Sequence, residues 1–211
     1  MEPVHKLGVH DVRLAQWRWL LGALHADFAA PHLSAAAAFA VAVSQYATDD
    51  TAVSIALSAR RVRITVSHRS SGVTATEVQL AERLSLAADE LHLSAVPDRI
   101  EAVELALDTP APGAVRPFWA AVLGLVDDGE DVVDPSGALP PLWFQQSDAT
   151  APDRQRFHVD VSVPPELADQ RIAAAVTAGG RIVERRFEPA FTVLADADGN
   201  QACVCTALGR D

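Results

Sequence analysis

The first half of the chain alternates between two hydrophobic patterns. The segments VSIAL (53–57) and VRITV (62–66) place apolar residues at every second position, which predicts strands. The segment WRWLLGALHADF predicts two further strands joined by a turn at Gly22. Ser34 is expected to cap a helix that runs to Ala47, because apolar residues follow it at helical spacing.

A second helix in this half is indicated by its first turn. Thr74 and Glu77 have the spacing of a capping box, in which each side chain bonds the backbone of the other residue. Apolar residues then recur at helical spacing. The predicted order is β-β-α-β-β-α, an antiparallel sheet with helices on one face.

The second half begins after a break at Pro97 and shows one arrangement twice. A strand (AVELALD), a helix expected to end at Gly124 and strands around EDVVD and PLWFQQ come first. The strand RFHVDVSV, a helix and the strands RIVERRF, AFTVLAD and QACVCTA follow, with a hairpin turn expected at Asp196–Asn200. Two successive β-α-β-β-β units predict a fold of paired modules. We therefore expect domains at residues 1–96 and 97–211.

Polar side chains occupy one face of the strands in the second half. Glu104, His158, Asp160 and Cys203 each alternate with apolar neighbours that are expected to face the helices. The histidine His158, the glutamate Glu104 and the thiol of Cys203, brought together in one concavity, suit a divalent cation. The alternative is a polar face that meets solvent or a partner.

One tryptophan and two histidines are also considered as site residues. Trp143 stands two positions before Gln145 and is therefore expected to line the same concavity, where it could stack on a flat ligand. His25 and His32 have no partner at the spacing of metal ligands, so both are expected to be solvated surface histidines.

Charge and composition exclude several classes of protein. The net charge of −11 argues against nucleic acid or an anionic membrane as a partner. We find no signal peptide and no apolar run long enough for a membrane span, and the two cysteines form no disulfide framework. A cytoplasmic protein is expected, and its sheet edges favour pairing into a homodimer.

The segments LALDTPAPGAVRPFWAAVLG, LWFQQ, RFHVDV and VLADADGNQACV resemble the glyoxalase-like branch of the vicinal oxygen chelate superfamily over roughly residues 98–207. The resemblance implies a cup-shaped sheet with Glu104, Gln145, His158 and Cys203 at the positions of the metal ligands. The implied cofactor is a divalent metal (Zn, Ni, Mn or Fe). Gln145 is a weak neutral ligand, and Cys203 stands where the family has a glutamate.

The segments HADF, AFAVAVSQYA, VRITVSH and SGVTATEVQLAERL resemble pterin-4a-carbinolamine dehydratase over roughly residues 10–92. The resemblance implies a lyase acting on 4a-hydroxytetrahydrobiopterin through histidines that transfer protons near neutral pH. His68 matches the third histidine of that family. The family's His-His-Pro triplet falls on Asp50, Thr51 and Ala52, so Asp50, Thr51 and His68 are the residues implied for catalysis.

The sequence therefore predicts an α+β protein with a dehydratase-like domain followed by a glyoxalase-like domain. The leading hypothesis is binding of a small molecule in the cup of the second domain, where Trp143, Gln145 and Asp160 contact the ligand. The first domain is expected to have lost activity with two of its three histidines. The alternatives are an active pterin dehydratase and a scaffold for binding or dimerisation that performs no chemistry.

Overall fold

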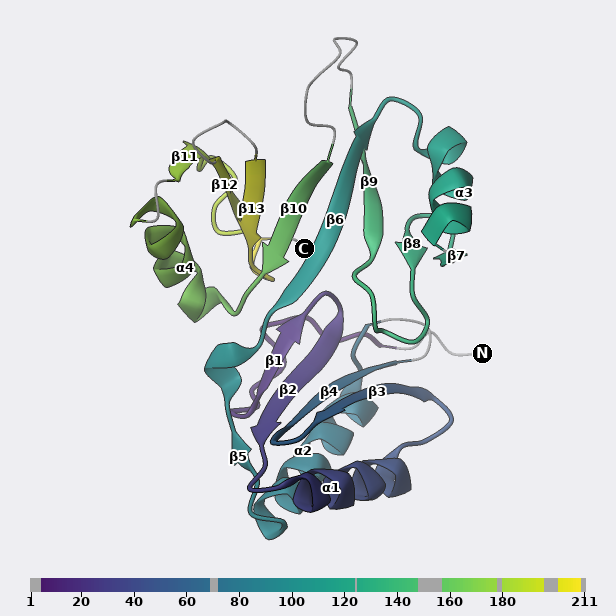
Figure 1. Ribbon diagram of the computed structural model, residues 1–211, viewed down its shortest axis with the longest axis vertical. Coiled ribbons are helices and arrows are strands. Elements are labelled where there is room, and N and C mark those ends of the chain that lie inside the picture. Colours follow the sequence, from purple (N-terminus) through teal and green to yellow (C-terminus); the bar gives the residue numbers. More distant parts are fainter. Residues whose placement is uncertain are drawn as a thin grey trace. The chain divides into compact units, whose positions relative to one another are not determined.

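The computed structural model describes residues 5–68, 72–123, 125–147, 157–177, 180–195 and 201–209. The chain forms two compact units, Met1–Ile100 and Glu101–Asp211. Each unit combines a sheet with two α-helices and has hydrophobic clusters of its own, so the fold is of the mixed α+β type (Figure 1). The predicted helix end at Gly124 and the predicted turn at Asp196–Asn200 lie outside the described residues.

The first unit has the predicted β-β-α-β-β-α order, followed by a short strand and a 3₁₀ turn. Its sheet has the order β1-β2-β4-β3, with β5 beside β2, and all of its pairs are antiparallel. Its elements are β1 (Trp17–Leu20), β2 (Ala23–Ala29), α1 (Leu33–Tyr46), β3 (Thr51–Ser58), β4 (Arg61–His68), α2 (Ala75–Glu90), β5 (Ser94–Ala95) and η1 (Pro97–Arg99).

The turn between β1 and β2 forms at the predicted place. Leu21 and Gly22 both have positive φ, 51° and 72°. Positive φ at both central residues of a two-residue hairpin loop is the type I′ geometry, whose twist matches that of the flanking strands. The Gly22 prediction is therefore confirmed.

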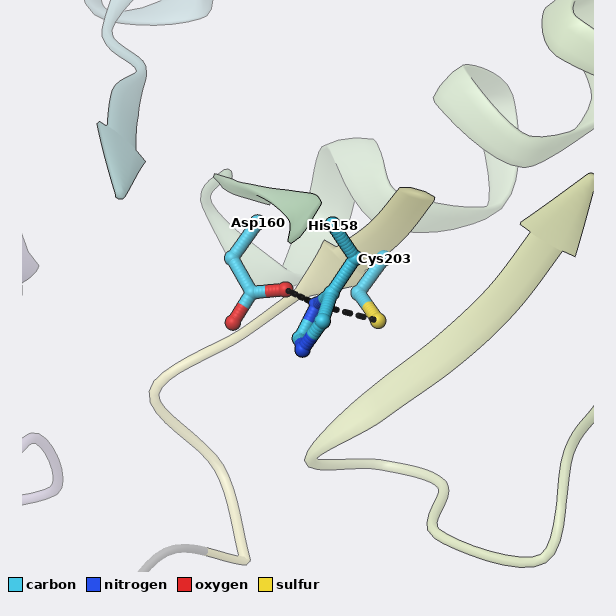
Figure 2. Close-up of side chains that lie close together, drawn as sticks. All are labelled: His158, Asp160 and Cys203. Atoms are coloured by element: carbon cyan, nitrogen blue, oxygen red, sulfur yellow. Dashed lines mark hydrogen bonds and ion pairs between the residues drawn. The ribbon is translucent and has the colours of Figure 1, made fainter. Parts of the chain in front are cut away.

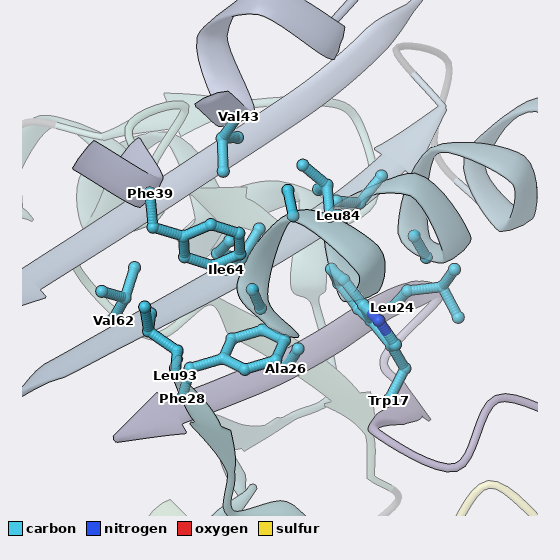
Figure 3. Close-up of a cluster of buried hydrophobic side chains, with 14 of the residues drawn as sticks. Trp17, Leu24, Ala26, Phe28, Phe39, Val43, Val62, Ile64, Leu84 and Leu93 are labelled. Carbon is cyan, nitrogen blue, oxygen red and sulfur yellow. The ribbon is translucent and has the colours of Figure 1, made fainter. Parts of the chain in front are cut away.

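One hydrophobic cluster holds both helices of the first unit against the same face of the sheet (Figure 3). Phe39 of α1 and Phe28 of β2 meet edge to face at 5.1 Å, and Phe28 also meets Trp17 at 6.3 Å. Leu84 of α2 is fully buried in the same cluster. Alternating apolar residues of β2 and β4 supply the sheet side of this core, as the strand pattern predicts.

The two helices differ in how they begin. The Thr74–Glu77 capping box is present, with the backbone N–H of Thr74 donating to Oε2 of Glu77 at 2.8 Å. The expected Ser34 cap is wrong: the helix starts at Leu33, and the N-cap is His32, whose Nδ1 accepts from the backbone N–H of Ala35 at 3.1 Å. His32 is therefore a capping residue and not only a solvated side chain.

His25 also departs from the expected surface histidine. Its Nε2 donates to the carbonyl of Leu20 at 3.1 Å, and its Nδ1 lies 3.2 Å from the Thr65 hydroxyl on β4. Burial lowers the pKa of His25 to about 4, and the nearby charge of Arg63 adds to this shift. Strand β2 lies between β1 and β4, and the imidazole contacts one residue of each neighbouring strand.

The second unit consists of the two predicted β-α-β-β-β modules joined into one sheet. The strand order is β11-β12-β13-β10-β6-β9-β8-β7, and the modules meet where β6 and β10 pair antiparallel. The first module is β6 (Ala102–Thr109), α3 (Pro112–Leu123), β7 (Val126–Asp127), β8 (Val132–Val133) and β9 (Leu142–Gln146). The second is β10 (Phe157–Ser162), α4 (Pro165–Thr177), β11 (Arg181–Glu184), β12 (Phe191–Ala195) and β13 (Gln201–Cys205).

Among the described residues, no helix combines the length and the apolar character needed to cross a membrane.

Candidate functional site

The two faces of the second unit's sheet have different environments. Alternate residues such as Leu107, Phe144 and Val204 belong to clusters that also contain Ala120 of α3 or Ile172 of α4. The residues between them point to the other face, which we call the cup. A cavity of about 600 Å³ lies there. The two-residue period of the strands therefore separates core positions from cavity positions.

All six residues that the sequence predicts for the second domain's site line this cavity: Glu104, Trp143, Gln145, His158, Asp160 and Cys203. Strand pairing brings them together. Asp160 on β10 is in register with Cys203 on the parallel strand β13 and with Glu104 on the antiparallel strand β6. A single central row of the sheet thus places a thiol and two carboxylates side by side.

His158 is the centre of a polar cluster in the cup (Figure 2). Its Nδ1 lies 3.0 Å from Oδ1 of Asp160 and 4.0 Å from Sγ of Cys203. Its Nε2 lies 3.5 Å from Oδ1 of Asp108. The hydrogen bond to Asp160 raises the pKa of His158, burial opposes this shift, and the charges of Asp160 and Asp108 reinforce it. Both ring nitrogens therefore face acidic groups.

Aromatic side chains form part of the cavity wall. The Trp143 ring meets the His158 imidazole edge to face at 6.0 Å, and Phe187 and Phe191 are stacked with their centroids 4.7 Å apart. The Arg186 guanidinium lies 4.6 Å from the centre of the Phe187 ring. Trp143 therefore lines the cup.

Several residues of the cavity wall are not predictable from the sequence pattern. Arg186, Phe187 and Phe191 come from the turn between β11 and β12 and the first residue of β12, where no hydrophobic period marks them. Asp131 also lines the cavity, and burial together with the neighbouring acidic residues raises its pKa. Asp108 was detectable, because it follows Glu104 by four positions on the same face of β6.

The residues of the cup fit a small divalent cation, but not with the whole ligand set that the resemblance implies. One ligand atom each from His158, Asp160 and Cys203 lies within 4.8 Å of the others. Nitrogen, carboxylate oxygen and sulfur are the three donor types of protein zinc sites. Among the residues that the structure describes, Glu104 lines the cavity without joining this compact group. Asp160, which the sequence predicts only as a contact of the organic ligand, belongs to this group.

The residues implied for pterin dehydration gather at one end of the β3–β4 pair. Thr51 at the start of β3 is in register with His68 at the end of β4, and the exposed Asp50 immediately precedes Thr51. The Thr51 hydroxyl donates to the carbonyl of Thr48 and accepts from its backbone N–H, each at 2.9 Å. Thr51 therefore has a local structural role in its own turn.

Comparison with known proteins places a family match in the second unit. Residues 104–205 match the model of the glyoxalase-like domain. No curated protein matches the chain. The family match does not extend into the first unit.

Three solved structures are similar to about half of the chain. A NAD-dependent benzaldehyde dehydrogenase from Legionella pneumophila is 14% identical over 49% of this chain and 97% of that chain, with a TM-score of 0.37. A glyoxalase/bleomycin resistance protein/dioxygenase superfamily member from Vibrio splendidus 12B01 is 13% identical over 51% and 98%, with a TM-score of 0.33. A glyoxalase/dioxygenase from Nostoc punctiforme is 19% identical over 48% and 86%, with a TM-score of 0.22.

Proposed function

We propose that the glyoxalase-like domain at residues 104–205 binds a small organic molecule in its cup. The observation that carries this proposal is the cavity of about 600 Å³ on the polar face of the sheet. Cavities of about 300–1,000 Å³ with apolar walls and a few convergent polar groups are the usual form of small-molecule sites. The stacked pair Phe187–Phe191 and Trp143 provide such walls, and His158 and Asp160 provide such polar groups.

The charge and shape of the lining define the class of ligand. Four carboxylates line the cavity, those of Glu104, Asp131, Asp160 and Glu188, against the imidazole of His158 and the guanidinium of Arg186. An anionic ligand would meet repulsion from this excess of carboxylates. Aromatic walls favour a flat ring. A neutral or cationic planar molecule is therefore the ligand class that the cup fits.

The first test of this proposal compares three aromatic probes of different charge. Calorimetric titration is expected to show binding of catechol, which is neutral, and tyramine, which is cationic, and at least about tenfold weaker binding of benzoate. Removing the Trp143 ring in Trp143→Ala should weaken binding about tenfold through lost ring contacts.

A matched pair of neighbouring glutamines on β9 controls for nonspecific damage. Gln145 lines the cavity, whereas Gln146 points to the other face and donates to the carbonyl of Pro110 at 3.0 Å. Gln145→Ala should weaken binding about fivefold, the effect of one hydrogen bond, and Gln146→Ala should leave it unchanged. Equal effects of the two changes, or benzoate as the tightest probe, would contradict a site in the cup.

For the first unit we propose a dehydratase-like fold without pterin dehydratase activity. The β-β-α-β-β-α order supports the resemblance. The chemistry, however, needs proton transfer by several histidines near neutral pH, and only His68 stands at a matching position. Thr51 is engaged with Thr48, and the carboxylate of Asp50 is exposed. The two other histidines of the family's reaction are replaced by Asp50 and Thr51 in this chain.

The dehydration of 4a-hydroxytetrahydrobiopterin tests this second proposal. The protein is expected to leave the spontaneous rate unchanged, and His68→Ala should give the same rate as the wild-type chain. A rate enhancement of about tenfold or more that disappears in His68→Ala would establish the active-dehydratase alternative.

A further inference from the structure

We infer that His158, Asp160 and Cys203 form a zinc site in the cup, with Asp160 in place of the first-strand carboxylate Glu104 and with Asp108 as a positioning residue. This inference goes beyond ligand binding in the cup and does not depend on the identity of the organic ligand. It also differs from the ligand set that the resemblance implies, Glu104, Gln145, His158 and Cys203.

The spacing of the three donors is the first reason. Ligand atoms around a tetrahedral zinc ion lie about 3.3–3.8 Å apart, given bonds of about 2.0–2.3 Å. The observed separations are 3.0 Å between Nδ1 of His158 and Asp160, and 4.0 Å between Nδ1 and Sγ of Cys203. These values lie on either side of the required spacing. The ligand atoms of Asp160 and Cys203 also lie within 4.8 Å of each other. Shifts of these atoms by about 1 Å or less would bring all three donors to the required spacing.

The charge of the group is the second reason. Asp160 and Cys203 are nearly inaccessible to solvent, with 4% and 7% of their surfaces exposed. A buried carboxylate needs a cation or several hydrogen bonds, because its desolvation is unfavourable. Asp160 has the imidazole of His158 as its partner. One divalent cation balances one carboxylate and one thiolate, and it would leave the group neutral with His158 as a neutral ligand.

The third reason is the other nitrogen of the imidazole. Zinc-bound histidines nearly always donate their second N–H to a carboxylate, a carbonyl or water, which fixes the orientation of the ring. Nε2 of His158 lies 3.5 Å from Asp108, while Nδ1 faces the other two donors. Asp108 therefore holds the ring so that Nδ1 is presented to the cation.

The backbone explains why Asp160 joins His158 and Cys203. His158 and Asp160 lie two positions apart on β10 and so share a face, and β13 runs parallel beside β10 with Cys203 in register with Asp160. Three donors from two hydrogen-bonded strands require no contribution from β6 or β9. When bound, a zinc ion would supply a Lewis acid to an oxygen of a molecule in the cavity.

Metal titration of the purified, metal-stripped full-length protein tests the inference. Zn²⁺ should bind with a stoichiometry of one, measured by competition with a chelating dye. Co²⁺ should give a thiolate-to-cobalt charge-transfer band in the near ultraviolet. Cys203→Ser should abolish the band, whereas Cys205→Ser, which changes a second buried cysteine of the same strand, should retain it.

A matched pair of carboxylates separates the two ligand sets. Asp160→Asn should weaken Zn²⁺ binding about 100-fold, while Glu104→Gln should change it less than about twofold. Asp108→Asn should weaken binding about tenfold and leave the Co²⁺–thiolate band in place, as expected of a residue that acts through His158. Circular dichroism of each variant checks that the fold is intact.

Two results would overturn the inference. A larger loss of affinity in Glu104→Gln than in Asp160→Asn would favour the first-strand carboxylate as the ligand. Absence of Zn²⁺ and Co²⁺ binding by the wild-type protein would mean that the three side chains form a hydrogen-bonded cluster and no metal site. The second result leaves the binding of catechol and tyramine to be judged by its own titration, so the two proposals fail separately.

Discussion

Leu84→Ala is expected to lower the free energy of unfolding of the first unit by about 3 kcal/mol, the usual loss when a buried leucine leaves a cavity. Leu84 is fully buried on α2, in the cluster that joins both helices to the sheet. Removing its side chain loses apolar contacts that the rigid sheet cannot replace by collapsing. For a unit of about 100 residues, the midpoint of thermal unfolding should fall by about 15 °C.

Leu86→Ala is the matched control on the same helix. Leu86 is 65% exposed, so the identical chemical change there should alter stability by less than about 0.5 kcal/mol. Calorimetry of the wild type and both variants supplies the measurement. Because the clusters of the two units share no residue, a transition assigned to the second unit should keep its midpoint in Leu84→Ala. A shift of the whole calorimetric unfolding curve in Leu84→Ala would show that the two units unfold together.

Strand and helix positions were predictable wherever one face of an element is buried and the other is not. In β10, His158 and Asp160 point to the cup, and the period of two residues alone predicts that they share a face. The same argument places Trp143 and Gln145 together on β9. Gly22 was identifiable because a two-residue hairpin loop requires positive φ. These features depend on local sequence only.

The composition of the proposed cation site depends on information that no local pattern contains. The two-residue period of a strand shows which face of the sheet each residue occupies. It does not show which strands lie beside that strand, because this depends on the order of strands in the sheet. Cys203 meets Asp160 because β13 pairs with β10, and Glu104 is on the opposite side of β10, on β6. The aromatic pair Phe187–Phe191 was missed for a related reason, since the turn that carries Phe187 has no hydrophobic period.

His25 shows the same limit for a half-buried polar residue. In the sequence, His25 has no partner at the spacing of metal ligands, so a position at the surface is predicted for it. In the structure its partners are Leu20, five residues before it, and Thr65 on β4. Only the pairing of β2 with both β1 and β4 brings these groups around the ring. The consequence is a histidine that is kept neutral.

Acidification from pH 6.5 to pH 4 is expected to remove up to about 3 kcal/mol from the stability of the first unit through His25 alone. The pKa of His25 is about 4 in the folded chain, against 6.5 for an unperturbed histidine. Between these values the unfolded chain binds a proton that the folded chain does not, so stability falls as the pH falls. Above pH 6.5 both states are neutral at this site, and the contribution is constant.

His25→Gln isolates this effect, because glutamine can keep the hydrogen bond to the Leu20 carbonyl and does not titrate. Urea unfolding at pH 7.5, 6 and 5 should show a smaller loss of stability on acidification for His25→Gln than for the wild type. His10→Gln, a change at an exposed histidine of the same unit, serves as the control and should follow the wild-type profile. Identical pH profiles for His25→Gln and the wild type would mean that the imidazole becomes protonated without unfolding. In that case burial of the ring would not lower the pKa of His25 in the folded chain.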